Sequence, residues 1–237
     1  MPGRILRRRR GHSLRAIVFD FDGTIVESVR TKTEAFRTLF AAYPDQVDRI
    51  VALHLEHGGR SRYEKFAMIY RDILAREPRD GEFQELGQRF ETLVGEEVVA
   101  CPFVPGAKAF LDDYSRRLPL IIISGTPELE LQSIVERRGL MPAFEEVHGS
   151  PPGKEEILTQ LIKRRGWAAS DVLFVGDAMS DWLAASGVQT RFVARVPAGE
   201  PSVFPESVQK IPDLVSLPEL LREIESRSPA ANDGVGR

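Results

Sequence analysis

The sequence predicts an α/β fold, in which a doubly wound parallel sheet carries an inserted domain made only of helices. Two kinds of segment alternate along the 237 residues: short runs of apolar, mostly β-branched residues, and amphipathic stretches with helical spacing. The stretch at 28–100 interrupts this alternation, because it has helical periodicity and no convincing strand signal. Strand–helix–strand alternation is typical of a Rossmann-like sheet with right-handed crossovers.

Four runs have the pattern of buried parallel strands, in which apolar residues follow one another without a break. They lie at 15–20, 120–124, 172–176 and 189–194. The segment 154–165 predicts an amphipathic helix, because Ile157, Leu158 and Leu161 share one stripe and Gly166 is placed to end it. Ligands of such sheets bind at the carboxyl ends of the strands, so the residues that follow each strand are the first candidates for a site.

The domain boundaries are expected where the pattern changes. We place the core at 14–27 and 101–225 and a helical cap at 28–100. Four helices are predicted in the cap, with breaks near Pro44, at Gly58-Gly59 and near Pro78. A chain of this length can bury most of its apolar surface, so its stability requires neither disulfides nor a structural metal.

The two ends of the chain differ in composition from the part between them. Residues 1–15 carry six arginines and no acid, so the remainder has a net charge of −9 against −3 for the whole chain. We expect 1–13 to be a disordered basic leader, either solvated or docked on an anionic partner, and 226–237 to be a disordered tail. The acidic remainder disfavours nucleic-acid binding, for which a basic face is needed.

The composition also bears on the compartment. The longest apolar runs, such as 120–123, are too short to span a bilayer, and no apolar stretch of a secretory signal accompanies Arg7–Arg10. The single cysteine, Cys101, excludes an intrachain disulfide framework and a multi-cysteine zinc site. We therefore expect a cytoplasmic protein with no membrane partner, either a monomer or a dimer.

Two carboxylates follow the first strand directly, in the run Asp20-Phe-Asp22-Gly-Thr24. Their spacing suggests that one attacks a substrate or binds a metal while the other moves protons. Gly23 permits a sharp turn there. A calcium loop is a competing interpretation, but the run of oxygen ligands and the glutamate that such a loop requires are absent.

Ser124-Gly125-Thr126 ends the second apolar strand. A hydroxyl beside free backbone amides at a strand-to-helix junction can bind an anion, although the same residues could simply cap the helix that follows. Lys154 falls in the first turn of its predicted helix, where the helix dipole disfavours a cation. An anionic partner would explain that position, and a solvated side chain is the alternative.

Asp177 and Asp181 follow the third strand and lie on one face of the helix predicted there. Such acids repel each other unless a cation lies between them, and ligands that offer only oxygen suit Mg²⁺ better than zinc. Asp181 or Asp177 could also serve as an ordinary helix cap. Taken together with the lysine, the hydroxyl and the first pair of acids, these residues suggest phosphoryl transfer through a covalent aspartyl phosphate.

The chain resembles the haloacid dehalogenase-like hydrolase superfamily from about residue 14 to about residue 225. The most specific motifs are Val18-Phe-Asp-Phe-Asp-Gly-Thr24 and Leu173-Phe-Val-Gly-Asp177 with Asp181. The resemblance implies that Asp20 is the nucleophile and Asp22 the general acid/base. It also implies Mg²⁺ as the cofactor. The metal ligands would be Asp20, Asp22 through its backbone carbonyl, Asp177 and, directly or through water, Asp181.

The same resemblance implies that Ser124, Gly125 and Lys154 bind the phosphoryl group. Many phosphatases of this branch have Gly-Lys-Pro around the lysine, whereas this chain has Pro-Pro-Gly-Lys154-Glu. The lysine assignment therefore depends on its position at a helix start. Dehalogenating members lack the second acid of the first motif, so Asp22 argues against that chemistry.

The cap contains a Gly-Arg60-Ser-Arg62 run. It is similar to the substrate-reading loop of β-phosphoglucomutase-like members, which belong to the same small-cap branch as phosphoglycolate phosphatases. By this likeness Arg62, with Arg60 beside it, is the candidate reader of a substrate anion, because the guanidinium fork suits phosphate or carboxylate. Two exposed residues at a helix start are the alternative.

These motifs predict a Mg²⁺-dependent phosphatase that acts on a small phosphorylated metabolite such as a sugar phosphate. A phosphosugar mutase is the alternative that the cap loop suggests, although Thr24 stands where mutases of this branch tend to have valine. A binding protein that docks through its basic leader is a third hypothesis, disfavoured by the complete set of catalytic residues.

Overall fold

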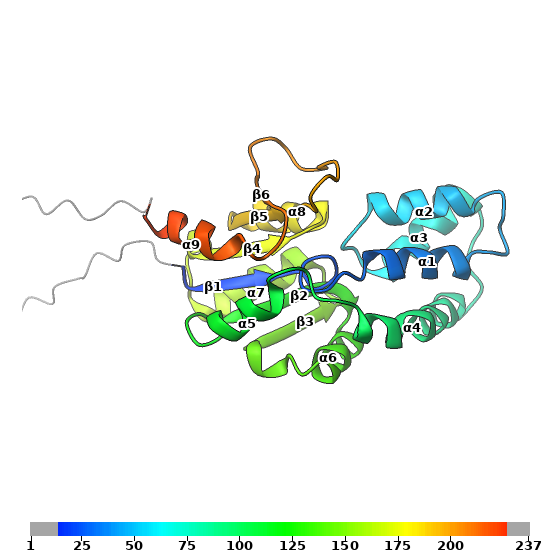
Figure 1. The fold of residues 1–237 in the computed structure, drawn as a ribbon. Helices are drawn as coiled ribbons and strands as arrows, with labels where there is room; N and C mark the ends of the chain where they lie inside the picture. Colours follow the sequence, from blue (N-terminus) through cyan, green and yellow to red (C-terminus); the bar gives the residue numbers. More distant parts are fainter. Residues whose placement is uncertain (1–13, 227–237) are drawn as a thin grey trace, which may run out of the picture.

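The computed structural model describes residues 14–226, and one parallel sheet lies at its centre (Figure 1). The strands stand in the order β3-β2-β1-β4-β5-β6. Their bounds are β1 (Ala16–Phe19), β2 (Leu120–Pro127), β3 (Glu146–Ser150), β4 (Val172–Gly176), β5 (Arg191–Arg195) and β6 (Gln209–Ile211). The chain order reverses at β1, which pairs with β2 on one side and β4 on the other. This is the doubly wound, Rossmann-like arrangement that the sequence predicts, and it opens a crevice beyond the end of β1.

Helices cover both faces of the sheet, because alternate residues of each strand point to opposite sides. Ile17 and Phe19 of β1 belong to one apolar cluster, and Ala16 and Val18 belong to the other. On the first face lie α5 (Ala107–Tyr114), α6 (Glu128–Arg137) and α9 (Leu217–Ser226). On the second lie α7 (Lys154–Arg165) and α8 (Met179–Val188). The strands are thus buried on both sides, which explains their unbroken apolar runs.

Between β1 and α5 the chain forms a group of helices at the end of the sheet where β1 ends (Figure 1). These are α1 (Val29–Leu39), α2 (Val47–Glu56), α3 (Arg62–Ile69) with a π-helical turn at Tyr70–Leu74, and α4 (Glu82–Ala100). Four phenylalanines fill their shared interior: Phe36, Phe40, Phe66 and Phe90. We call α1 to α4 the helical insertion.

The four predicted strands all form, and two further strands were not predicted. β3 and β6 are the two edge strands and contain polar residues such as Glu146, His148 and Lys210, so they lack the apolar run of a central strand. Helix α9 extends to Ser226, the first residue of the predicted tail. The basic leader and the rest of that tail lie outside the described residues. Within 14–226, no helix is long and apolar enough to cross a membrane.

Candidate active site

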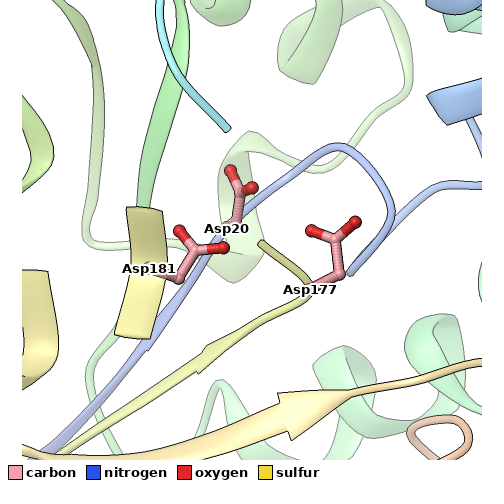
Figure 2. Close-up of side chains that lie close together, drawn as sticks. All are labelled: Asp20, Asp177 and Asp181. Atoms are coloured by element: carbon pink, nitrogen blue, oxygen red, sulfur yellow. The ribbon is translucent and has the colours of Figure 1, made fainter. Parts of the chain in front are cut away.

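Three aspartates meet at the carboxyl ends of β1 and β4. Asp20 directly follows β1, Asp177 directly follows β4, and Asp181 lies in the first turn of α8. One carboxylate oxygen from each lies within 4.8 Å of the others. Figure 2 shows the three side chains pointing to the same side of the sheet end. The close approach of the turn after Asp20 to Asp177 requires a glycine. Gly23 has a φ of +75°, and a Cβ there would lie 2.0 Å from Asp177 Oδ2.

Lys154 joins this cluster from the first turn of α7. Its Nζ lies 3.0 Å from Asp20 Oδ2 and 2.6 Å from Asp181 Oδ1. Burial alone would lower the pKa of Lys154, but the carboxylates of Asp181 and Asp20 outweigh that effect and raise it. The lysine therefore stays charged, and the position that the helix dipole disfavours is explained by two anionic partners.

One lysine does not balance three acids, of which Asp20 and Asp181 are buried and Asp177 is partly buried. Burial raises the pKa of Asp20 to about 7 although Lys154 opposes the shift. Burial, followed by the charges of Asp20 and Asp181, also raises the pKa of Asp177 well above its ordinary value. A cation beside these groups would relieve the repulsion, and an all-oxygen donor set suits a hard divalent ion such as Mg²⁺. The residues present therefore fit a metal of that class.

The three acids are not equally available to a metal. Asp181 uses Oδ1 on Lys154 and accepts a hydrogen bond from the Ala178 N–H at Oδ2, 3.0 Å away. Asp177 receives only a long hydrogen bond from Thr24, at 3.4 Å. Asp177 and Asp20 are thus the better candidates for direct ligands, and Asp181 is the better candidate for positioning Lys154.

Asp22 lies outside this cluster of carboxylates. Its side chain accepts hydrogen bonds from Ser28 Oγ at 2.6 Å, Lys32 Nζ at 2.5 Å and Thr126 Oγ1 at 3.0 Å. Burial opposes ionisation of Asp22, but the ammonium of Lys32 and the two hydroxyls outweigh it and lower the pKa. Asp22 is therefore ionised and held near the insertion by a lysine of α1. Its predicted metal ligand is the backbone carbonyl, which these contacts leave free to bind.

The predicted phosphate-binding residues line a groove of about 770 Å³ between the sheet and the helical insertion. Ser124, Gly125 and Lys154 lie on its sheet side, and the segment 59–61, which precedes α3, lies opposite. The Ser124 hydroxyl accepts a hydrogen bond from the Thr126 N–H at 3.2 Å, and Ser150 Oγ donates to the Gly125 carbonyl at 2.9 Å. The groove is thus lined by Lys154, the residue whose ammonium contacts the nucleophile candidate Asp20.

Arg60 and Arg62 differ in where the structure places them. Arg60 is half exposed, lines the groove, and lies 3.7 Å from Glu64. Arg62 is buried, and its Nη2 donates to both carboxylate oxygens of Glu130 of α6, at 2.6 and 2.7 Å, while its guanidinium lies over the ring of Phe90. The charge of Arg62 is thus already matched by an acid of the chain, so nothing here supports its predicted role as an anion reader.

Sequence reasoning missed three basic or polar residues near the site. Lys32 binds Asp22 and also donates to Thr126 Oγ1 at 2.8 Å. His54 and Lys65 lie buried together in the helical insertion. The signal that could have found the two lysines is their scarcity, because the chain has only six lysines among its 32 basic residues. No such signal marks His54.

Comparisons with known proteins identify a family and relatives of similar sequence. The family described as haloacid dehalogenase-like hydrolase matches residues 14–188. A phosphoglycolate phosphatase from Synechococcus elongatus is 28% identical over 179 residues, which cover 74% of this chain and 80% of the relative. The residues matched by the family include both aspartate motifs of the site.

Solved structures share the fold at low identity. A predicted phosphoglycolate phosphatase from Haemophilus somnus gives a TM-score of 0.68 at 19% identity, covering 87% of this chain and 97% of that one. A hydrolase from Bacillus subtilis, bound to magnesium, gives 0.65 at 18% identity, covering 89% of this chain and 99% of that one. CbbY from Rhodobacter sphaeroides, in complex with phosphate, gives 0.68 at 16% identity over 86% of this chain and 96% of that one.

Proposed function

The chain belongs to the haloacid dehalogenase-like hydrolase family and is a phosphoric monoester hydrolase, and from that premise we propose a finer function. It is a Mg²⁺-dependent phosphatase that hydrolyses a small phosphorylated metabolite through an aspartyl phosphate on Asp20. The observation that carries the proposal is the placement of Asp20 between Lys154 and Asp177 at the switch point of the sheet. The names of the relatives support a small phosphorylated substrate.

In the first step, an Asp20 carboxylate oxygen forms a bond to phosphorus and the bond from phosphorus to the ester oxygen breaks. Lys154, the Ser124 hydroxyl and the Gly125 N–H hold the phosphoryl oxygens and offset the charge that develops on them. The leaving alkoxide takes a proton from the Asp22 carboxyl, which enters this step with the proton that it accepted from water in the second step of the preceding turnover. Because Lys32 lowers the pKa of Asp22, transfer of that proton to the alkoxide is favoured.

In the second step, Asp22 acts as a base. Its carboxylate accepts a proton from water, and the hydroxide that results attacks the aspartyl phosphate and releases phosphate and free Asp20. The low pKa that Lys32 and the hydroxyls give Asp22 keeps it in the form that this step needs. Asp20 and Asp177, with Asp181 and the Asp22 carbonyl, would hold Mg²⁺, which when bound supplies positive charge between the carboxylates and the phosphate.

We further propose that the helical insertion, residues 28–100, acts as a cap over this site. Ser180 Oγ donates a hydrogen bond to the Gly58 carbonyl at 3.0 Å, so the segment between α2 and α3 contacts the start of α8. A Cβ on Gly125 would lie 2.3 Å from the Gly59 carbonyl oxygen. Such close contact supports a cap that closes on the phosphate-binding residues and keeps bulk water away from the intermediate.

The test is phosphate release by the purified protein with Mg²⁺ against a panel of phosphorylated metabolites. Asp20→Asn should reduce turnover by at least about a thousandfold, because the nucleophile is lost. Asp80→Asn, at an exposed position, is the matched control and should leave turnover unchanged. Undiminished activity in Asp20→Asn would contradict the proposal. With a hexose 1-phosphate and catalytic bisphosphate, isomerised sugar phosphate in place of free phosphate would favour the mutase.

A further inference from the structure

A lysine and a histidine lie side by side in the interior of the helical insertion. Lys65 of α3 and His54 of α2 are 5% and 6% exposed, and Lys65 Nζ lies 3.2 Å from His54 Nδ1. An ammonium can only donate, so Nδ1 accepts this hydrogen bond and the ring proton of a neutral imidazole is on Nε2. Burial, followed by the charge of Lys65, lowers the pKa of His54 to about 2, in keeping with a neutral ring.

Lys65 differs from the other buried basic side chains of residues 14–226. Each of the other buried lysines and arginines in that range forms an ion pair with a carboxylate. Lys154 pairs with Asp20 and Asp181. Arg62 pairs with Glu130, and Arg195 pairs with Glu27. No carboxylate of the described residues lies within ion-pair distance of the Lys65 ammonium, whose contacts are His54 and the face of Phe36, 5.7 Å away. A buried charge without a counter-ion is costly, so this position favours an anion from outside the chain.

The pair lies one helical turn from a residue that binds Asp22. The Lys65 ammonium is 5.7 Å from the ring of Phe36, which stands four positions after Lys32 on the same side of α1. Lys32, which binds Asp22 directly, is close enough to influence the pKa of both His54 and Lys65. Burial is the largest cause of the lowered pKa of Lys65. The charges of Asp22, Lys154 and Asp177 also act on it. Since Lys32 binds Asp22 and Thr126 at the end of the sheet, the Lys65 ammonium over Phe36 lies on the side of α1 that carries these contacts.

We propose that Lys65 and His54 bind a carboxylate of the substrate, so that the enzyme selects phosphate monoesters of small hydroxy acids. This inference rests on the proposed phosphatase function and names the substrate class. The pair offers a second N–H donor, from His54 Nε2, and one positive charge when the Lys65 amine is protonated. Burial lowers the pKa of Lys65 to about 7, and a bound carboxylate would favour the protonated form. That complement matches a carboxylate, with one negative charge and two oxygens, better than a second phosphate with nearly two charges. Lys32 is not counted as a ligand of this carboxylate, because its ammonium binds Asp22.

The turnover test compares two substrates of similar size, 2-phosphoglycolate and 2-hydroxyethyl phosphate, which lacks the carboxylate. For the wild type we expect kcat/KM to favour phosphoglycolate on the order of 100-fold, because the site would otherwise leave a buried charge unpaired. Lys65→Met should bring that ratio close to one, mainly by raising KM for phosphoglycolate. It should leave kcat/KM for 2-hydroxyethyl phosphate within about threefold of the wild type.

Lys65→Arg and Lys108→Met complete the set of variants. Lys65→Arg keeps the positive charge and should restore part of the preference for phosphoglycolate. If Lys65 served packing alone, Lys65→Met would preserve that preference better than Lys65→Arg. Lys108 is exposed, so its methionine variant should behave as the wild type. Lys65→Met should also melt no lower than the wild type, because an apolar side chain replaces a charge that lacks a counter-ion. Equal loss on both substrates would overturn the proposal, as would a wild type without preference.

A binding arm separates failure of this inference from failure of the proposed function. In the Asp20→Asn background, which holds the ester unreacted, the dissociation constants of both esters are measured by calorimetry with and without Lys65→Met. We expect the added substitution to weaken phosphoglycolate at least about tenfold and 2-hydroxyethyl phosphate little. If neither ester is hydrolysed by the wild type, the phosphatase assignment fails. If the substitution weakens both esters alike, carboxylate recognition fails.

Discussion

Arg62 and Glu130 form a buried ion pair that joins α3 of the helical insertion to α6 beside the sheet, with Nη2 of Arg62 donating to both carboxylate oxygens at 2.6 and 2.7 Å. The two side chains are 5% and 8% exposed. Since each charge has lost its water, the pair depends on both partners remaining in place. Together with the contact of Ser180 with Gly58, it fixes the insertion over the site.

Removal of one partner should therefore cost more than removal of both. We expect Arg62→Met or Glu130→Gln alone to lower the free energy of unfolding by about 3 kcal/mol, and the double variant to recover at least about 1 kcal/mol of that loss. Urea denaturation of the four proteins measures this coupling. The exposed pair Arg117 and Asp113 is the control, and its coupling should stay below about 1 kcal/mol. Additive losses for Arg62 and Glu130 would contradict the account.

Mg²⁺ should stabilise the protein more at pH 8 than at pH 5. The pKa of Asp20 is raised to about 7 in the folded protein, so its contribution to stability is complete below the unfolded pKa near 3.8 and is lost as pH rises through about 7. The metal replaces protons on Asp20 and Asp177, so it binds more strongly where those protons have left. The increase in Tm at saturating Mg²⁺ should grow from about one degree at pH 5 to several degrees at pH 8.

Asp177→Asn is the matched variant for that measurement, because it removes one charge of the cluster and keeps its size. It should lower the increase in Tm at pH 8 and raise the Mg²⁺ concentration needed for half-maximal activity by at least about tenfold. An increase in Tm that is equal at both pH values, or unaffected by Asp177→Asn, would argue against a metal at these carboxylates.

Gly125→Ala tests the closeness of the insertion to the phosphate-binding segment. The added Cβ would lie 2.3 Å from the Gly59 carbonyl oxygen, so the two backbones must separate. We expect kcat/KM to fall by about 100-fold, with a smaller effect on Tm, because the displacement changes the geometry around the phosphate. Gly95→Ala in α4, where a Cβ meets nothing within 4 Å, is the control and should leave kcat/KM unchanged. Equal activity in both variants would mean that closure does not require this contact.

The strands and the acids that follow them could be predicted from the sequence because both depend on local pattern. Asp20 and Asp177 each follow a run of buried apolar residues, and a doubly wound sheet brings such strand ends together. Lys154 could be predicted from its conflict with the helix dipole. The edge strands β3 and β6 could not, since each has a polar, partly exposed pattern.

The partners of the cap residues depend on tertiary packing that no local pattern records. Arg62 and Glu130 are separated by 68 positions, and Glu130 lies in a helix whose sequence is rich in acids. Lys65 and His54 lie on different helices, and their burial follows from how α2 and α3 pack around Phe36 and Phe66. The sequence motif around Arg62 identified a segment that borders the groove, but the structure pairs the Arg62 guanidinium with Glu130 of α6.

The central claim is that Asp20 carries the phosphoryl group during turnover. The most direct measurement is to quench the protein with acid during hydrolysis of a good substrate and locate the phosphoryl group by mass spectrometry of its peptides. The account predicts a phosphorylated peptide that contains Asp20, formed within the first turnover and absent in Asp20→Asn. Turnover without any phosphorylated peptide under conditions that preserve acyl phosphates, or a phosphoryl group on another residue, would contradict it.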